Sequence, residues 1–288
     1  MMNNSFCTFI ISHGRPDKVI TLNTLKRCNY TGPLFIVCDN EDKTIDQYKR
    51  NFGSDMVLVF DKIKYASMVD NADNFQNRRT TTHARNACFD LAEEKGFEYF
   101  LVLDDDYTSF RNIFDAEGNF SRRKVSNINL IFESMRSFLD LDDRIDSICM
   151  LQGGDMIGGQ NSTIWKSQFF PFNHRKAMNS FFCKTSRRFW FFSRLNEDVN
   201  TYLDLGNRGR LFFTMPEVQL TQAQTQATSG GMSEAYLASG TYVKSFYTVM
   251  ICPSFAIATV SPSMKRMHHR ISWNNAVPKI IDQAHKKQ

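Results

Sequence analysis

Three consecutive carboxylates, Asp104-Asp105-Asp106, are the strongest chemical feature of the sequence. They follow the apolar run 100–103, which is typical of a buried strand. Adjacent carboxylates repel one another, and each costs free energy when it is buried without a partner. A divalent cation removes that cost, and hard oxygen ligands suit Mg²⁺ or Mn²⁺. The cluster indicates a metal site, and a helix N-cap or solvated turn is the alternative.

A second acidic feature, Asn196-Glu197-Asp198, stands alone in basic and aromatic surroundings. Between Gln160 and Leu195 the chain has seven Lys and Arg and no carboxylate. Such isolation favours a general base or an anchor for an acceptor hydroxyl. Ordinary carboxylates at a helix N-terminus explain the pair equally well.

Two adjacent histidines, His268 and His269, lie near the end of the chain. Neighbouring side chains point in different directions, so at most one of them would bind a given metal ion. A structural role for both is the alternative.

Three arginines of the first half, Arg15, Arg78 and Arg85, are candidates for binding an anion, whereas Arg79 reads as an ordinary surface residue. Arg85 lies on a predicted helix, 80–95, whose first turn has free N–H groups. No glycine-rich phosphate loop occurs, which disfavours a kinase or a dinucleotide enzyme.

These side chains need a scaffold, and the first 150 residues alternate strands with helices. We expect an α/β fold with an open, mostly parallel sheet covered by helices on both faces. Ligands bind beyond the carboxyl ends of the strands in such sheets, where this chain carries Ser12 to Arg15, Asp39 and the Asp104 cluster. The predicted strands are 6–11, 34–38, 56–60, 99–103 and 147–151, and the predicted helices are 17–28, 44–52, 80–95 and 125–139.

The second half is less regular and rich in aromatic residues. The pair Gly153-Gly154 indicates a flexible connection, and the Gln-rich stretch 219–231 indicates a mobile loop or lid, with a polar surface helix as the alternative. We find no repeat and no clear linker. We therefore expect a single domain over 1–288, divided into a half 1–155 and a half 156–288.

The net charge of +5 conceals an asymmetry. Residues 1–155 carry 19 Lys and Arg against 24 Asp and Glu, a net −5, whereas residues 156–288 carry 16 against 6, a net +10. The basic half suits an anionic partner such as nucleic acid or a phosphorylated ligand. A solubilising surface is the alternative.

Composition excludes several classes of protein. A hydrophobic content of 42% excludes a disordered chain. The sequence has no apolar run long enough to span a membrane and no signal-like N-terminus. Seven scattered cysteines without a C-x-x-C pair suit reduced thiols in the cytoplasm and disfavour a zinc site.

Together these motifs resemble the nucleotide-sugar glycosyltransferases of the GT-A fold, in an order that covers residues 6–270. The matching pieces are Phe9 to Ser12 with Arg15, Ile36 to Asp39, Ala84-Arg85-Asn86, Leu103 to Asp106, Asn196-Glu197-Asp198, and a late histidine. The resemblance implies a GT-A-like fold: a Rossmann-like, mostly parallel sheet flanked by helices, with an irregular acceptor-side lobe over 156–288.

The same resemblance implies a role for each motif in a hexosyltransferase-type reaction. Asp39 would read the nucleobase, Asp104 would face the ribose, and Asp106 would hold Mn²⁺ or Mg²⁺. His268 or His269 would complete the metal shell. Glu197 and Asp198 would hold or deprotonate the acceptor. The remaining donor-site residues would be Ser12, Arg15, Arg78, Arg85 and Asp105.

A narrower set of runs is similar to the TET-associated glycosyltransferases of bacteriophages. The runs are His13 to Pro16, Leu103 to Tyr107, Leu195 to Tyr202 and His268-His269-Arg270. That family is thought to glycosylate 5-hydroxymethylcytosine in phage DNA. The resemblance implies a UDP-sugar or related donor, a DNA acceptor, no membrane partner, and a location in the cytoplasm of the infected bacterial host.

A DNA acceptor would give the basic half its role. Trp190 or Phe191 could stack on a flipped base, and the alternative is that the aromatic run containing them is mostly core. Gly153, Gly154 and Arg187 are further acceptor-side candidates.

Three competing functions stay open. The same fold could act on a carbohydrate, lipid or protein acceptor, and salt-sensitive DNA binding would argue against that. A metal-dependent nucleotidyltransferase could use the same carboxylates, and its products would differ in mass. A non-catalytic DNA-binding protein would leave Asp104 to Asp106 unexplained. The sequence leaves the inverting or retaining outcome open.

Overall fold

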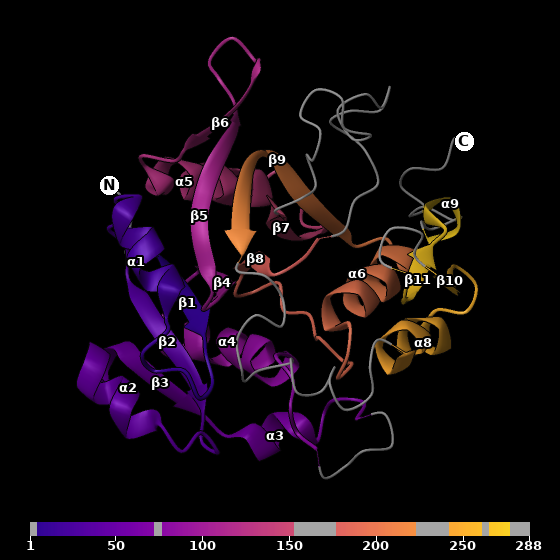
Figure 1. Cartoon of the computed structure of the whole chain (residues 1–288), viewed down its shortest axis with the longest axis horizontal. Coiled ribbons are helices and arrows are strands. Elements are labelled where there is room, and N and C mark those ends of the chain that lie inside the picture. The colour runs from indigo at the N-terminus through magenta and orange to yellow at the C-terminus, as the bar shows by residue number, and fades with distance from the viewer. Residues whose placement is uncertain (1–4, 72–76, 153–176, 223–241, 261–264, 277–288) are drawn as a thin grey trace.

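The computed structural model describes residues 5–71, 77–152, 177–222, 242–260 and 265–276. These residues form one nine-stranded sheet in the order β3-β2-β1-β4-β8-β7-β9-β5-β6, and a separate two-stranded sheet, β10-β11 (Figure 1). The strands are β1 (Phe6–Ile11), β2 (Leu34–Asp39), β3 (Val57–Phe60), β4 (Tyr99–Asp104), β5 (Tyr107–Phe114), β6 (Phe120–Lys124), β7 (Ile145–Gln152), β8 (Ser180–Lys184), β9 (Leu211–Gln222), β10 (Ala256–Val260) and β11 (Met267–Ile271).

Helices cover both faces of the large sheet. The helices are α1 (Ile20–Arg27), α2 (Ile45–Phe52), the short 3₁₀ turn η1 (Ser54–Met56), α3 (Lys62–Ala66), α4 (Thr82–Glu94), α5 (Ile128–Leu139), α6 (Glu197–Asn207), α8 (Tyr242–Ile251) and α9 (Trp273–Ala276). Apolar side chains of α1, α2 and α5 join one core cluster, and those of α3, α4 and α6 join the other. This double cover explains why β1 is buried at every position and reads as a continuous apolar run.

The expected α/β architecture with a helix-flanked sheet is confirmed. Strands β3, β2, β1 and β4 are all parallel, as the alternation of strands and helices in the first half predicts. Beyond β4 the sheet is mixed, because β8 runs antiparallel to both of its neighbours, whereas β7 and β9 are parallel. Strand β7 therefore points in the same direction as β4, and the carboxyl ends of β1, β2, β4 and β7 lie at one edge.

The second half contributes more regular structure than the sequence pattern suggests. Strands β8 and β9 both enter the main sheet, and β8 lies between β4 and β7, which come from the first half. Residues 219–222, expected at the start of a loop or lid, are the last residues of β9. The rest of that stretch, 223–231, lies outside the described residues, as do Gly153 and Gly154. Strands β5 and β6 were not expected at all.

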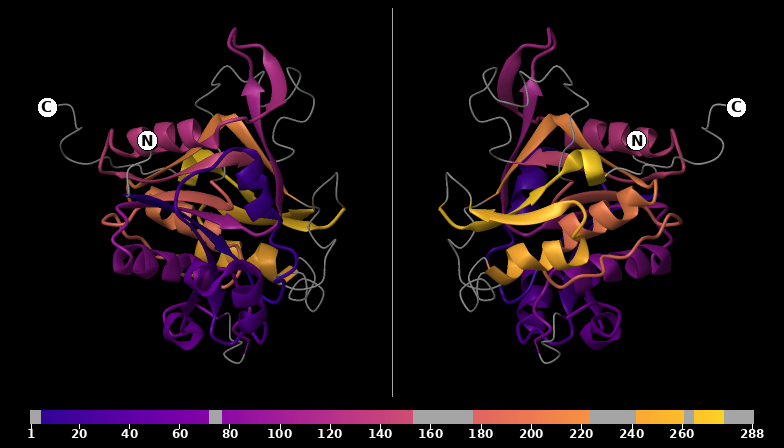
Figure 2. Two further views of the ribbon diagram at one scale, coloured as in Figure 1. Left: turned by 90° about the vertical axis from the view of Figure 1, so that its left-hand side faces the viewer. Right: turned by 90° about the vertical axis from the view of Figure 1, so that its right-hand side faces the viewer.

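Helix α8 and the hairpin β10–β11 pack together beside α6 (Figures 1 and 2). Within the described ranges, no helix is long and apolar enough to cross a membrane.

Candidate active site

The three consecutive aspartates lie where β4 ends, as expected, but each has a different environment. In the register between β1 and β4, Ile11 pairs with Asp104, so the residues after β1 reach the cluster. Ser12 Oγ donates to Asp105 Oδ2 at 2.5 Å, and Arg15 Nη2 lies 3.1 Å from Asp105 Oδ1. Burial raises the pKa of Asp105 to about 6, opposed by Arg15 and Ser12. Ser12, Arg15 and Asp105 thus form one buried structural contact at this edge.

Asp104 is bound by an arginine from the facing helix α4. Arg85 Nη2 lies 3.2 Å from Asp104 Oδ1, and Arg85 Nε lies 3.4 Å from Glu197 Oε1. The guanidinium also stacks over Phe181 and Phe191, at 5.1 and 5.9 Å from the ring centroids. Burial raises the pKa of Asp104 to about 7, and the charge of Arg85 opposes that shift.

The position of Arg85 corrects an expectation. We expected it to bind donor phosphates, but its side chain is only 2% exposed and forms ion pairs with Asp104 and Glu197. The physical reason is that Phe181 of β8 and Phe191 cover the guanidinium. Arg85 joins the cluster at β4 to the acidic pair at the start of α6, two motifs that are more than 90 residues apart.

Glu197 and Asp198 begin α6, as the sequence suggested, but their environments differ. Glu197 accepts a hydrogen bond of 2.5 Å from Thr81 Oγ1 in addition to its ion pair with Arg85. Burial raises the pKa of Glu197, opposed by Arg85. Asp198 accepts a 2.8 Å hydrogen bond from the backbone N–H of Val199. Of the two carboxylates, Glu197 is the one held within the buried network.

The two carboxylate oxygens of Asp106 differ, because one accepts a hydrogen bond and the other has no hydrogen-bond partner among the described residues. Gln222, at the end of β9, donates to Asp106 Oδ2 at 3.1 Å. The other oxygen, Oδ1, is buried and has no hydrogen-bond partner among the described residues. Burial raises the pKa of this carboxyl. A buried acceptor without a donor fits a cation ligand, so Asp106 suits the role expected of it. Gln222 is a site residue that the sequence pattern did not reveal.

The two histidines do not join this cluster. Both lie on β11, and the buried His269 has its Nδ1 3.2 Å from Asn196 Nδ2. In the described ranges, no three His, Cys, Asp or Glu side chains lie close enough together to hold a metal ion. The expected joining of Asp104, Asp106 and His268 or His269 is therefore absent there, because β11 belongs to a separate sheet packed on α8.

Asp39 lies at the end of β2, on the expected edge of the sheet, but its carboxylate is already paired. His13 Nδ1 lies 2.7 Å from Asp39 Oδ2, and Lys62 Nζ donates to Oδ1 at 3.2 Å. Burial works to raise the pKa of Asp39, but His13 and Lys62 outweigh it, so the pKa is lowered. Arg78, expected in the donor site, binds Glu41 on the loop that follows β2, with Nε at 2.8 Å from Oε1.

Arg187, expected on the acceptor side, lies at the opposite edge of the sheet. Its Nη1 donates to the backbone carbonyls of Leu139, Asp142 and Ile145 at 2.6, 3.0 and 3.0 Å. Ile145 begins β7, and β7 points the same way as β4, so Arg187 is far from the carboxyl end of β4. The structure therefore does not bring Arg187 to the aspartate cluster, where we expected the acceptor.

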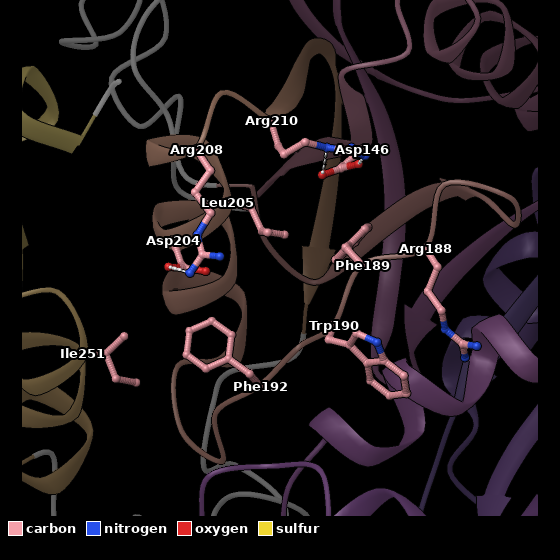
Figure 3. A pocket seen from close by; sticks show the side chains of 10 residues that line it. All are labelled: Asp146, Arg188, Phe189, Trp190, Phe192, Asp204, Leu205, Arg208, Arg210 and Ile251. Atoms are coloured by element: carbon pink, nitrogen blue, oxygen red, sulfur yellow. Dashed lines mark hydrogen bonds and ion pairs between the residues drawn. The ribbon is translucent and has the colours of Figure 1, made fainter. Parts of the chain in front are cut away.

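The aromatic run also differs from the expectation. Phe191 is 1% exposed and packs in the core, which excludes base stacking on its ring. Trp190 lines an open groove of about 540 Å³ beneath the guanidinium of Arg188. Figure 3 shows that Asp204, Leu205 and Arg208 also line this groove. These three residues are near the end of α6, so the groove lies at the far end of that helix from Glu197.

Three solved structures to which the chain is similar are 8 to 12% identical to it. Glucosyl-3-phosphoglycerate synthase from Mycobacterium tuberculosis, in complex with Mn²⁺, UDP and phosphoglyceric acid, is 8% identical, with 93% of this chain and 86% of that chain covered and a TM-score of 0.47. Mannosyl-3-phosphoglycerate synthase from Rubrobacter xylanophilus is 9% identical, with 93% and 86% covered and a TM-score of 0.43. Residues 1–349 of TarS from S. aureus are 12% identical, with 77% and 61% covered and a TM-score of 0.40.

No curated protein matches the chain. The model of one protein family, the TET-associated glycosyltransferases, matches residues 6–231. That span contains the aspartates at the end of β4, the covering helix α4 with Arg85, and the acidic pair at the start of α6. The resemblance inferred from the short motifs is thereby confirmed, and the chain belongs to the TET-associated glycosyltransferase family.

Proposed function

We propose that this glycosyltransferase moves a sugar from a nucleoside diphosphate-sugar, with UDP-sugars as the first donors to test, to the hydroxymethyl group of 5-hydroxymethylcytosine in phage DNA. The observation that carries the proposal is the buried network Asp104–Arg85–Glu197. Arg85 connects Asp104, of the motif that we assign to the donor, with Glu197, of the motif that we assign to the acceptor. The donor and the acceptor would therefore bind next to each other.

A divalent metal ion, Mn²⁺ or Mg²⁺, is part of the proposal. Asp106 would hold it through Oδ1, the buried oxygen without a hydrogen-bond partner in the described structure. Mg²⁺-type sites commonly use one or two carboxylates together with substrate phosphates and water, so a histidine ligand is not required. When bound, such an ion stabilises the negative charge that develops on a departing diphosphate.

On the donor side, Arg15 and the paired Asp39 are the residues we assign to the nucleotide. Arg15 uses Nη2 on Asp105, but its buried Nε has no acceptor within the described residues and can donate to a phosphate oxygen. Asp39 would read the base together with His13 and Lys62, which already fix its carboxylate. We assign Arg85 to positioning Asp104 rather than to contact with the donor.

On the acceptor side, we propose that Asp198 binds the hydroxyl group that receives the sugar. Glu197 is held by Arg85 and by Thr81, which leaves Asp198 as the less constrained carboxylate of the pair. In an inverting reaction Asp198 would take the proton of the hydroxyl. In a retaining reaction it would only orient that hydroxyl, because the leaving phosphate can accept the proton.

A DNA acceptor is consistent with the net +10 of residues 156–288. All seven cysteines, each within the described ranges, are buried free thiols. That state suits the cytoplasm of an infected bacterium, where we propose the enzyme acts.

Mass spectrometry of DNA tests this proposal. Duplexes containing 5-hydroxymethylcytosine are incubated with a panel of nucleotide sugars, with and without Mn²⁺, and a mass increase of one sugar per modified base is expected. Cytosine-only duplexes serve as the acceptor control, and nucleoside triphosphates test for nucleotidyl transfer. A product that carries a nucleotide, or sugar transfer only to carbohydrate or protein, would overturn the assignment.

A further inference from the structure

Strand β9 ends beside the aspartate cluster, although Gln222 and Asp106 are 116 residues apart in the chain. Strand β9 runs parallel to β7, so it ends at the same edge of the sheet as β4. In the register between β5 and β9, Gln222 pairs with Tyr107, the residue that directly follows Asp106. Strand pairing between distant parts of the chain therefore sets the position of Gln222 at the site.

The side-chain amide of Gln222 has a defined orientation. An amide presents an NH₂ donor on one side and a carbonyl acceptor on the other, whereas an ionised carboxylate only accepts. Asn179 Nδ2 donates to Gln222 Oε1 at 3.4 Å, and Gln222 Nε2 donates to Asp106 Oδ2 at 3.1 Å. The donor from Asn179 keeps the carbonyl of Gln222 away from the carboxylate, so that the NH₂ group faces Asp106.

Asn179 is itself held in place by its backbone. It directly precedes β8, and Tyr107 Oη donates to its backbone carbonyl at 2.8 Å. The ring of Tyr107 is fully buried. Asn179 has a φ of 61°, in the left-handed region where Asn is enriched. Tyr107, Asn179 and Gln222 thus form a chain of hydrogen bonds that connects three strands of the sheet to Asp106.

This chain of hydrogen bonds reaches only one oxygen of Asp106. Gln222 donates to Oδ2, whereas the buried Oδ1 has no hydrogen-bond partner among the described residues. The terminal torsion of an aspartate side chain is broad, so a carboxylate without a partner turns readily. The hydrogen bond from Gln222 restricts that rotation. It therefore determines which oxygen of Asp106 stays available and where that oxygen points.

The orientation of Asp106 matters because few protein groups lie near it that could share a metal ion. Across the described ranges, no three His, Cys, Asp or Glu side chains are close enough together to hold one. A metal ion at Asp106 would depend on one or two carboxylates, together with substrate phosphates and water. Residues that hydrogen-bond to a ligating carboxylate orient it, and their loss typically lowers metal affinity by about 10- to 100-fold.

We propose that Gln222 is a positioning residue for the divalent metal ion, because it holds Oδ2 of Asp106 so that Oδ1 faces the ion. Gln222 contributes no ligand of its own, since its Oε1 accepts the hydrogen bond from Asn179. Asn179 supports this role by fixing the amide of Gln222. The inference rests on the metal ion of the proposed function and adds the residue that orients its ligand.

The test is a titration of each protein with Mn²⁺, alone and with UDP, in which electron paramagnetic resonance measures the free ion. Gln222→Met keeps a side chain of similar length but removes the donor, and it should weaken Mn²⁺ binding by about 10- to 100-fold. Asn179→Gly tolerates the left-handed φ and removes only the side-chain amide. This variant should weaken Mn²⁺ binding by a smaller factor than Gln222→Met.

Gln219→Met is the matched control on the same strand. Gln219 is fully buried, donates Nε2 to Gln152 O at 3.0 Å and accepts a 2.9 Å hydrogen bond from Arg122 Nη2. Its replacement removes two hydrogen bonds of β9 that do not involve Asp106. Melting curves should show that this variant loses at least as much stability as Gln222→Met, whereas its affinity for Mn²⁺ should equal that of the wild type.

Three results would overturn the inference. Wild-type affinity for Mn²⁺ in Gln222→Met would refute the positioning role and leave Asp106 as the metal ligand, provided that Asp106→Asn loses Mn²⁺ binding. Equal weakening in Gln219→Met and Gln222→Met would attribute the effect to a general disturbance of β9. If the wild type binds no more Mn²⁺ than Asp106→Asn does, the metal ligand of the proposed function is itself refuted, and the role of Gln222 with it.

Discussion

Arg85 Nη2 on α4 lies 3.2 Å from Asp104 Oδ1 at the end of β4, within a core that leaves the arginine 2% exposed. The same guanidinium lies 3.4 Å from Glu197, so one buried cation compensates two carboxylates from distant parts of the chain. Removing one member of a buried ion pair leaves the other charge uncompensated, which costs much more than the pair itself contributes.

Arg85→Met should therefore destabilise the fold by about 3–5 kcal/mol and abolish sugar transfer. Arg85→Lys keeps the charge but loses the planar fork that reaches two carboxylates. We expect the lysine variant to have a melting temperature between those of the wild type and Arg85→Met. Its kcat should change by a larger factor than its KM for the donor. Denaturant unfolding and steady-state kinetics measure these effects. Wild-type stability in Arg85→Met would contradict the bridging role.

Asp106→Asn should reduce sugar transfer by on the order of 100-fold or more and leave the fold intact. Burial already raises the pKa of Asp106, so a neutral amide of similar shape is tolerated there. Transfer is measured across a Mn²⁺ titration, with melting curves alongside. Asp143→Asn, at a fully exposed position near the start of β7, is the matched control. Near-normal turnover of Asp106→Asn with Mn²⁺ would refute the assigned metal ligand.

His13 makes the stability pH-dependent. The hydrogen bond to Asp39 is the main cause that raises the pKa of His13 in the folded protein. The stability that this contact adds is therefore fully present below the pKa that His13 has in the unfolded chain. It is lost as the pH rises through the pKa that His13 has in the folded protein. The wild type should be more stable than His13→Gln at about pH 5.5, and the difference should shrink towards about pH 9. Chemical unfolding of both proteins across this range measures it. A difference that grows with pH would contradict the pairing.

Trp190→Ala should leave donor and acceptor KM within about twofold of the wild type. The ring is partly exposed in a groove at the far end of α6 from Glu197, so its removal neither opens the core nor reaches the acidic pair. Kinetics with a 5-hydroxymethylcytosine duplex provide the measurement. A tenfold rise in the KM for the acceptor would contradict this prediction and would indicate that Trp190 binds the acceptor.

Asn196→Ala should uncouple α8 and the hairpin from the acidic pair. It removes the side-chain hydrogen bonds to Lys244 and Thr248 and places a non-glycine, non-Asn residue at a left-handed φ. We expect a lower melting temperature and a raised acceptor KM, with donor KM unchanged. Asn196→Gly relieves the backbone strain but does not restore the side-chain hydrogen bonds. It should therefore recover part of the stability and none of the acceptor affinity.

Local sequence patterns predicted the parallel strands of the first half and the position of its main carboxylates, although they missed β5 and β6. Apolar runs of strand length predicted β1, β2 and β4, and the turn after each run placed Ser12, Asp39 and Asp104 at one edge of a parallel sheet. The short ordered motifs were sufficient to indicate the family that the model over residues 6–231 confirms. Such patterns are visible because strand and helix periodicity depends only on neighbouring residues.

Only the tertiary structure decided which of these side chains meet. The insertion of β8 between β4 and β7 buries Arg85 under Phe181 and turns an expected phosphate ligand into a bridge between carboxylates. The same strand order takes Arg187 to the opposite edge of the sheet. Pairing between strands far apart in the chain is set by the packing of the whole core, which no local window of sequence contains.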